Sequence, residues 1–402
     1  MNNFEQTCTI IRENLSPEYR FLLNLLYRSE LPINLNDEFN WERFISLARK
    51  HKVVPQVAFE VFSPAIREKI PKQYFEQLQS HTERNTQKSL ILLGELLKIH
   101  EVFKKNAINI LPLKGPALAI ELYGGVNQRT MVDLDILVRE KDIQTAAELL
   151  LGMGYQSTHS ILPTFISFFS GRDYHSNFHH RNGVIVEIHW RFDENKNALP
   201  LDILNVFEGT KELTCSGRII PTLSFENEYL YLSYHGGKHC WAELKWITDL
   251  YKINRDKEID WDVIWELAVK TGNQNSVALS SWCLCVLSGC KPTWQIEEHI
   301  RNDENFSKLL PYVLHTLFED ESKVRDLFDI KKIATRAGEV DYLKILFPSR
   351  SFQQEQSLLQ WKPTFHDYRF LSLPRSCVYL YYLIRPIRVI MGKFSHVASN
   401  MI

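Results

Sequence analysis

Two aspartates, Asp133 and Asp135, lie within an otherwise apolar run, "VDLDILV". Side chains two positions apart in a β-strand share one face. We therefore expect these carboxylates to project together, while Leu134 and Ile136 face the core. Adjacent carboxylates repel each other unless protons or a cation hold them, and paired oxygen ligands are typical of Mg²⁺ or Mn²⁺ bound together with substrate phosphates. The pattern predicts a divalent-metal site, although an Asp-x-Asp pair alone also suits an exposed strand end.

A third acidic residue, Glu187, lies in a second apolar run, "VIVEIHWRF". If the two runs form neighbouring strands, Glu187 supplies a third carboxylate. Three carboxylates can hold two divalent ions, an arrangement that stabilises the attacking and leaving oxygens in phosphoryl or nucleotidyl transfer. His189 shares the strand face of Glu187. It is a candidate for contact with metal or substrate, and a hydrogen-bonded structural histidine is the alternative.

A glycine turn, "LKGP", precedes the aspartates and is followed by a helical pattern, "ALAIELY". A turn that opens a helix directs backbone N–H groups toward an anion. Lys114 adjoins Gly115 in this turn, and Arg129 lies four residues before Asp133. These two cations are placed where a triphosphate would bind. We therefore predict nucleotide-binding roles for Lys114, Gly115 and Arg129.

The elements that must position these residues alternate between strand and helix. The order is a β-rich run at 108–114, a helix at 115–125, a strand at 132–138, a helix at 140–155 and a strand at 184–192. Helical patterns dominate on both sides. The expected fold is α+β, with a small mixed β-sheet core at 107–224 flanked by helical regions at 1–106 and 225–402.

A second group of polar residues, "HGGKH", spans His235 to His239. The two histidines are one helical turn apart, but no acidic or cysteine partner completes a zinc pattern. Lys238 is the best candidate for contact with a phosphate or an acceptor, and His235 and His239 are further candidates for substrate contact. Helix packing is the alternative for all three.

Composition limits the class of protein. The 402 residues include 47 basic and 48 acidic side chains, so the chain is nearly neutral and no general binding of nucleic acid is expected. Seven scattered cysteines without a C-x-x-C pair favour reduced thiols, and the N-terminal sequence has no signal-peptide pattern, so we expect a cytoplasmic protein. Arg385 interrupts the apolar run near the C-terminus, which favours a buried or interfacial helix, and contact with a membrane is the less favoured reading.

The ordered motifs resemble the uncharacterised nucleotidyltransferase family of the polymerase-β-type superfamily. The resemblance runs roughly from Trp41 to Trp265 and is strongest at 111–138 and 187–190. It implies a metal-dependent transfer of a nucleoside monophosphate from an NTP, with pyrophosphate release. By this resemblance, Asp133, Asp135 and Glu187 are the catalytic and metal-binding carboxylates, with two ions of Mg²⁺ or Mn²⁺. The nucleotide-binding turn corresponds to Lys114-Gly115.

One residue departs from the superfamily pattern. Pro116 follows Gly115 where the superfamily usually has Gly-Ser or Gly-Gly, and proline offers neither a hydroxyl nor an N–H group to a phosphate. Our hypothesis is that Lys114 and Arg129 replace that contact.

The acceptor is left open by the sequence. Near-neutral charge favours a peptide, a small molecule or a protein side chain over a long polynucleotide. The alternatives are a toxin-like nucleotidyltransferase that modifies tRNA, an inactive protein that binds NTP on the same fold, and a scaffold without nucleotide affinity.

Overall fold

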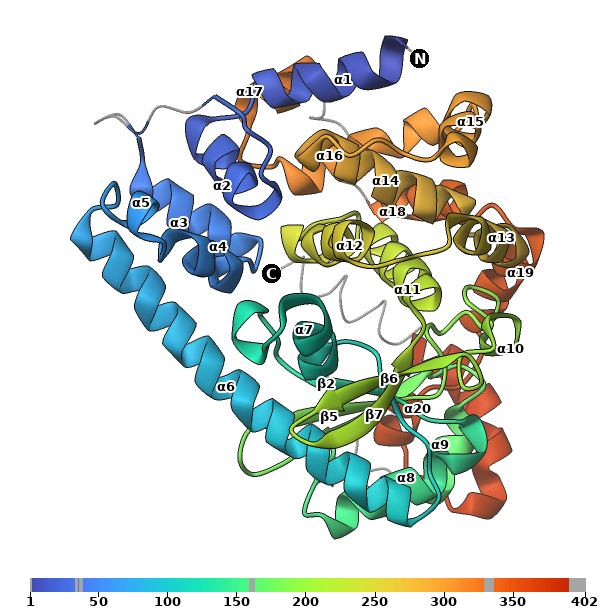
Figure 1. The fold of residues 1–402 in the computed structure, drawn as a ribbon. Helices are drawn as coiled ribbons and strands as arrows, with labels where there is room; N and C mark the ends of the chain where they lie inside the picture. Colours follow the sequence, from blue (N-terminus) through green and yellow to red (C-terminus); the bar gives the residue numbers. More distant parts are fainter. Residues whose placement is uncertain (1, 33–34, 36–38, 159–162, 329–335, 390–402) are drawn as a thin grey trace, which may run out of the picture. The chain divides into compact units, whose positions relative to one another are not determined.

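The computed structural model describes residues 2–32, 35, 39–158, 163–328 and 336–389 (Figure 1). The chain divides into two compact units, each built from three separate segments. The helical unit comprises Met1–Leu93, Pro116–Met131 and Leu223–Pro348. The sheet unit comprises Gly94–Gly115, Val132–Thr222 and Ser349–Ile402.

The sheet unit is built on a five-stranded mixed sheet. Its strands are β1 (Leu111–Pro112), β2 (Leu134–Leu137), β3 (Gln156–Ser157), β4 (His175–His179) and β5 (Ile185–His189), in the order β1-β2-β5-β4-β3. β2 and β5 are parallel, and the other neighbours are antiparallel. This small mixed sheet with flanking helices confirms the predicted α+β fold.

Alternation along β2 and β5 explains why the two strands pair as they do. The register sets Leu134 opposite Val186 and Ile136 opposite Ile188, and all four side chains are buried. A shift of the register by one residue would turn this apolar set to the other face. Burial of these residues therefore fixes the register and gives the opposite face to the polar residues between them.

Helices and a hairpin complete the sheet unit. The helices are η2 (Glu140–Asp142), α8 (Ile143–Gly152), α9 (Pro163–Phe169), α10 (Leu201–Leu204), α19 (Arg350–Leu359), α20 (Phe365–Phe370) and η5 (Arg375–Leu380). The hairpin of β6 (Thr210–Cys215) and β7 (Arg218–Leu223) turns at Ser216 and Gly217, both with positive φ, as a two-residue hairpin turn requires. This hairpin is absent from the predicted elements.

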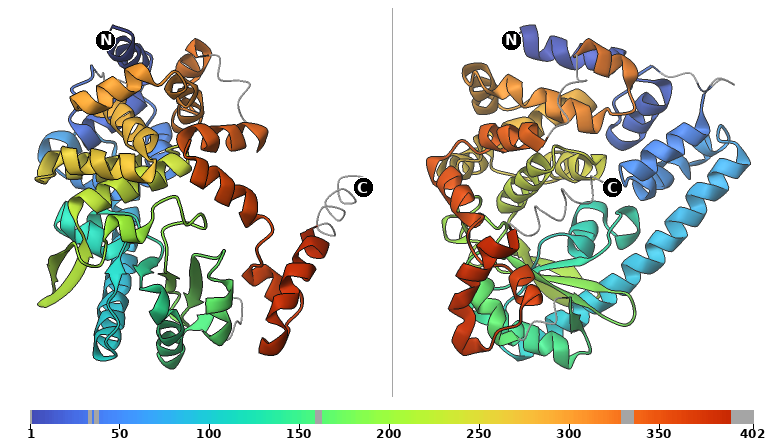
Figure 2. Two further views of the ribbon diagram at one scale, coloured as in Figure 1. Left: turned by 90° about the vertical axis from the view of Figure 1, so that its right-hand side faces the viewer. Right: turned by 180° about the vertical axis from the view of Figure 1, so that it is seen from behind.

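The C-terminal segment packs into the sheet unit, although the residues lie far apart in sequence. The ring of Phe169 on α9 lies 5.5 Å from the ring of Phe365 on α20 and 5.5 Å from that of Tyr381. Figure 2 shows the C-terminal helices beside α9. Each unit therefore contains segments from all three regions expected from the sequence. The region boundaries at 106 and 224 stay a prediction.

The helical unit packs around large buried aromatic side chains that include Tyr229, Trp241 and Trp282. Its elements are α1 (Asn2–Glu13), α2 (Pro17–Tyr27), α3 (Trp41–Lys50), α4 (Val54–Val61), α5 (Pro64–Arg67), η1 (Val126–Gln128), α11 (Phe225–Lys238), α12 (Leu244–Asp256), α13 (Trp261–Thr271), α14 (Gln274–Ser288), α15 (Trp294–Asn302), η3 (Phe306–Lys308), α16 (Leu310–Leu317), α17 (Ser322–Leu327) and α18 (Arg336–Leu346). Side-chain caps at Ser16, Asn40 and Asp260 begin α2, α3 and α13.

Two helices contain a boundary between the units, at Leu93–Gly94 in α6 (Lys72–Lys105) and at Gly115–Pro116 in α7 (Gly115–Tyr123). Within the described ranges, no helix is both long enough and apolar enough to span a bilayer.

Candidate metal and nucleotide site

Two carboxylates face each other across the central strands of the sheet unit. The parallel register of β2 and β5 pairs Asp135 with Glu187. Asp135 is 8% exposed, and Glu187 is half-buried. Neighbouring strands lie about 4.8 Å apart, so a register pair of acidic side chains brings two negative charges into one small volume. The two runs therefore form neighbouring strands, which is the condition on which we expect Glu187 to join the aspartates.

His189 completes the cluster. Its Nε2 atom lies 3.1 Å from Oδ1 of Asp135 and 3.4 Å from Oε2 of Glu187. Burial opposes a charge on the ring, but the hydrogen bonds to Asp135 and Glu187 outweigh burial and raise the pKa of His189. The two carboxylates therefore favour the protonated form of the ring.

The charge of Glu187 responds to the same neighbours. Burial opposes its ionisation, and so does the negative charge of Asp135. The hydrogen bond to His189 and the nearby His175, whose Nε2 lies 4.0 Å from Oε2 of Glu187, outweigh both effects and lower the pKa of Glu187. Glu187 is consequently kept as a carboxylate, the form that binds a cation.

These side chains fit a divalent metal ion. Among the described residues, Asp135, Glu187 and His189 each bring one potential ligand atom within 4.8 Å of the other two. Carboxylate oxygens and an imidazole nitrogen are common ligands of divalent ions. Asp133, at the entry to β2, is half-buried and is not a member of this cluster. Its role as a metal ligand stays a prediction.

The glycine turn lies against the backbone of the aspartate strand. The Leu113 N–H donates to the carbonyl of Asp135 at 3.0 Å. Gly115 has φ +65, and a Cβ atom there would lie 3.5 Å from the carbonyl oxygen of Asp133. Glycine adopts this left-handed conformation without the steric cost that other residues have. The turn therefore places Lys114 next to the start of β2, where it is half-buried. Its nucleotide-binding role stays a prediction.

Arg129 belongs to the helical unit, where its guanidinium has an acidic partner. Nε lies 3.1 Å from both carboxylate oxygens of Asp249 on α12, and Nη2 lies 2.8 Å from Oδ2. Both side chains are almost fully buried, and the Tyr123 hydroxyl also donates to Asp249 at 2.8 Å. Sequence reasoning missed Asp249. The available signal was an aspartate on the apolar face of "KWITDLYKI".

The "HGGKH" residues also belong to the helical unit. The ring of His235 lies 4.8 Å from that of His239 and 5.2 Å from that of Trp246. Packing explains the glycine at position 236, because a Cβ atom there would overlap the Trp241 ring. Lys238 ends α11. Substrate contact by His235, Lys238 and His239 stays a prediction.

Lys245, also in the helical unit, is a lysine with a side chain only 12% exposed, which sequence reasoning missed. Burial, followed by the charge of Arg129, lowers its pKa to about 8, although Glu243 lies 3.4 Å away. It is the second residue of "LKWITDL", at the start of α12, where nothing in the pattern distinguishes it from a solvated lysine.

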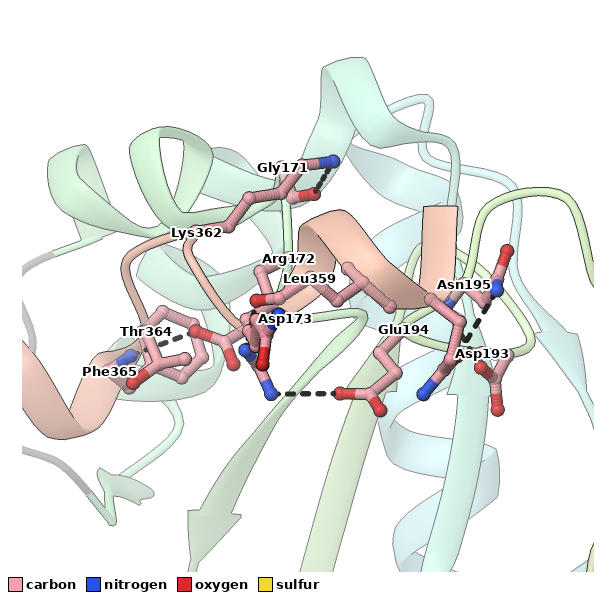
Figure 3. A network of polar contacts seen from close by, with 12 residues as sticks. Gly171, Arg172, Asp173, Asp193, Glu194, Asn195, Leu359, Lys362, Thr364 and Phe365 are labelled. Atoms are coloured by element: carbon pink, nitrogen blue, oxygen red, sulfur yellow. Dashed lines mark hydrogen bonds and ion pairs between the residues drawn. The ribbon is translucent and has the colours of Figure 1, made fainter. Parts of the chain in front are cut away.

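A polar network joins the C-terminal segment to residues just before β4 and to residues just after β5 (Figure 3). Arg172 Nη2 lies 3.4 Å from Oε2 of Glu194, and the Phe365 N–H donates to Asp173 at 2.8 Å. The Asn195 side chain donates to the Phe352 carbonyl at 2.9 Å. Burial raises the pKa of Asp173 to about 7. These contacts join the C-terminal segment to the chain on which Glu187 and His189 lie.

Comparison with known proteins gives one match. A family model described as uncharacterised nucleotidyltransferase matches residues 37–287, more than half of the chain. The matched range includes the carboxylates, the glycine turn and Arg129. Searches of curated proteins and of solved structures found no match.

Proposed function

Because the chain belongs to the uncharacterised nucleotidyltransferase family, we propose that it transfers a nucleoside monophosphate from an NTP to an acceptor hydroxyl, or a similar nucleophile, and releases pyrophosphate. The observation that supports this most directly is the pairing of Asp135 with Glu187 across parallel strands. Bound Mg²⁺ or Mn²⁺, two ions in the full arrangement, would supply positive charge to the attacking and leaving oxygens.

The side chains around the sheet take separate roles in this proposal. Asp135 and Glu187, with Asp133 at the entry to β2, would hold the ions. Lys114, in the turn beside Asp133, would contact the triphosphate in place of the N–H group that Pro116 lacks. Arg129 is bonded to Asp249, so we assign the phosphate contact to Lys114 first.

The reaction forms one bond to phosphorus and breaks another. The acceptor oxygen attacks the α-phosphorus in line, and the new O–P bond forms as the bond from the α-phosphorus to the oxygen bridging to the β-phosphate breaks. The acceptor proton passes to water, and pyrophosphate leaves. We favour a peptide, a small molecule or a protein side chain as acceptor, because the chain carries almost no net charge.

Calorimetric titration with ATP, GTP, CTP and UTP, with and without Mg²⁺ or Mn²⁺, tests the proposal. We expect binding that requires the divalent ion and weakens at least about 100-fold in Asp135→Asn and in Glu187→Gln, since each removes a ligand. Asp202→Asn, an exposed aspartate of the same unit, should bind as the wild type does. Absence of NTP binding in the folded protein would overturn the proposal. Binding without turnover on any acceptor would leave an NTP-binding protein instead.

Lys114→Ala tests the turn. Loss of a hydrogen bond from a charged group costs about 1.5–3 kcal/mol, so the apparent KM for the NTP should rise by about 10-fold or more. Lys141→Ala, at an exposed lysine of the same unit, is the matched control. An unchanged KM in Lys114→Ala would remove Lys114 from the site.

A further inference from the structure

The position of His189 is set by the same register that pairs the carboxylates. Leu137 is the register partner of His189, two pairs beyond the pair of Asp135 and Glu187. Side chains two positions apart share a face, so His189 lies on the face of Glu187 and Asp135. Its ring nitrogen, Nε2, lies within 3.4 Å of an oxygen of each carboxylate.

The distances from Nε2 of His189 to the two carboxylate oxygens are those of ligands that share one ion. Two ligands that each bind an ion at about 2.1 Å, at right angles to each other, are about 3 Å apart. Nε2 of His189 is 3.1 Å from the Asp135 oxygen and 3.4 Å from the Glu187 oxygen. An ion could therefore bind all three atoms after only small side-chain movements.

The ring of His189 is held in this orientation by its surroundings. It is 5% exposed and stacks on the His175 ring, with centroids 5.1 Å apart and planes 23° apart. The ring of Tyr174, the residue before His175, lies 5.8 Å from the His189 ring. Within the described part of the chain, Nδ1 of His189 has no hydrogen-bond partner. The polar contacts of the ring are thus made at Nε2, toward the carboxylates.

We propose that Nε2 of His189 is a metal ligand and that this nitrogen makes the site select Mn²⁺, or a similar transition-metal ion, over Mg²⁺. Mg²⁺ binds oxygen ligands and keeps several waters, whereas imidazole suits transition-metal ions. A site made of carboxylates alone has no such preference built into its ligands. This inference rests on the proposed function for the presence of a metal, and it names the class of ion.

Pulsed EPR of Mn²⁺ added to the full-length protein tests the ligand directly. Coupling between the manganese and a directly bound ¹⁴N nucleus is expected in the wild type and should be lost in His189→Gln. The matched control is His175→Gln, because His175 is the register partner of His189 and its Nε2 lies 4.0 Å from Glu187. The His175 variant should keep the nitrogen coupling.

Calorimetric titration with each ion supplies a second readout. We expect Mn²⁺ to bind the wild type at least about 10-fold more tightly than Mg²⁺, and His189→Gln to reduce that ratio by about 10-fold or more. Should His189→Gln fail to fold, the wild-type and His175→Gln spectra still decide the question. Bound Mn²⁺ without nitrogen coupling in the wild type, or coupling that disappears in His175→Gln, would overturn the inference.

The outcomes separate this inference from the proposed function. Metal-dependent NTP binding without nitrogen coupling leaves the function standing and overturns the ligand. Nitrogen coupling without any NTP binding leaves the ligand standing and overturns the function. A folded protein that binds neither Mn²⁺ nor Mg²⁺ overturns both.

Discussion

At the scale of single residues, the candidate site is made of residues whose positions are restricted by strand register, hydrogen bonds or backbone conformation. Asp135 and Glu187 are held by backbone register, and His189 lies within hydrogen-bonding distance of both. Gly115 is a comparable case in the backbone, because its positive φ lets the turn approach the carbonyl of Asp133. The effect of substituting one of these residues should therefore depend on the local geometry at that position.

Gly115→Ala should destabilise the protein by about 1–2 kcal/mol, because a residue with a Cβ atom bears a steric cost in the left-handed conformation. The matched control is Gly94→Ala within α6, where a Cβ would meet nothing within 4 Å. That change should stabilise the protein by about 0.5–1 kcal/mol through helix propensity. Urea denaturation of both variants measures the difference, and equal effects would show that the turn tolerates a side chain.

At the scale of elements, a buried ion pair joins the 116–131 segment to α12 inside the helical unit. Arg129 and Asp249 have side chains 3% and 0% exposed. Taking two charges out of water is costly, and their mutual attraction offsets that cost only when both are present. The pair therefore fixes the geometry of the segment that follows α7.

Arg129→Met should destabilise the helical unit by about 3–5 kcal/mol, because it leaves the Asp249 carboxylate buried without its cation. The double variant Arg129→Met/Asp249→Leu should recover part of the loss. Recovery should be incomplete, since the Tyr123 hydroxyl then loses its acceptor. Thermal and urea unfolding measure all of these changes.

An exposed pair on the same helix provides the control. Arg255 and Asp256 have side chains 35% and 33% exposed, and breaking a surface pair costs about 1 kcal/mol or less. Arg255→Met should therefore have a small effect. If Arg129→Met is equally mild, the buried pair does not hold the segment.

At the scale of the whole molecule, the chain leaves the sheet unit at residue 222 and returns to it at residue 349. The returning segment is held by polar contacts as well as by aromatic packing. Asp173 accepts a hydrogen bond from the Phe365 backbone, and Asn195 donates to Phe352. Because α19 and α20 belong to the sheet unit, we expect the nucleotidyltransferase core to need its C-terminal segment for stability.

The pKa of Asp173 makes this docking dependent on pH. Burial raises that pKa from 3.8 to about 7, so the folded state holds its proton more tightly than the unfolded chain does. The stabilising contribution is complete below pH 3.8 and is lost as the pH rises toward 7. Relative to Asp173→Asn, the wild type should lose about 1.4 kcal/mol of unfolding free energy per pH unit over that range.

Urea denaturation of both proteins at several pH values between 4 and 8 tests this expectation. The difference between them should stop changing above about pH 7, where Asp173 is ionised in both the folded and the unfolded chain. Parallel curves for wild type and variant would show that the carboxyl titrates normally. Hydrogen exchange at the Phe365 amide reports on the same contact.

The sequence by itself determined the parts of this protein that depend on local pattern. Alternation along "VDLDILV" and "VIVEIHWRF" predicts two strands and identifies which residues share a face, and the glycine before a helical run predicts the turn. Family resemblance added the expected chemistry, and the family match confirms the family. These features are readable because the period of a strand is fixed by backbone geometry.

Only the tertiary structure decided which of these residues meet. Cross-strand register brought His189 to the two carboxylates, the Arg129 guanidinium met Asp249 120 residues away, and Asp173 met a backbone amide 192 residues away. A repeating pattern specifies a face of one strand or helix, but it does not specify the partner across the gap. That partner is set by the packing of the whole core, which is why the meeting of Asp135, Glu187 and His189 became visible only in the folded chain.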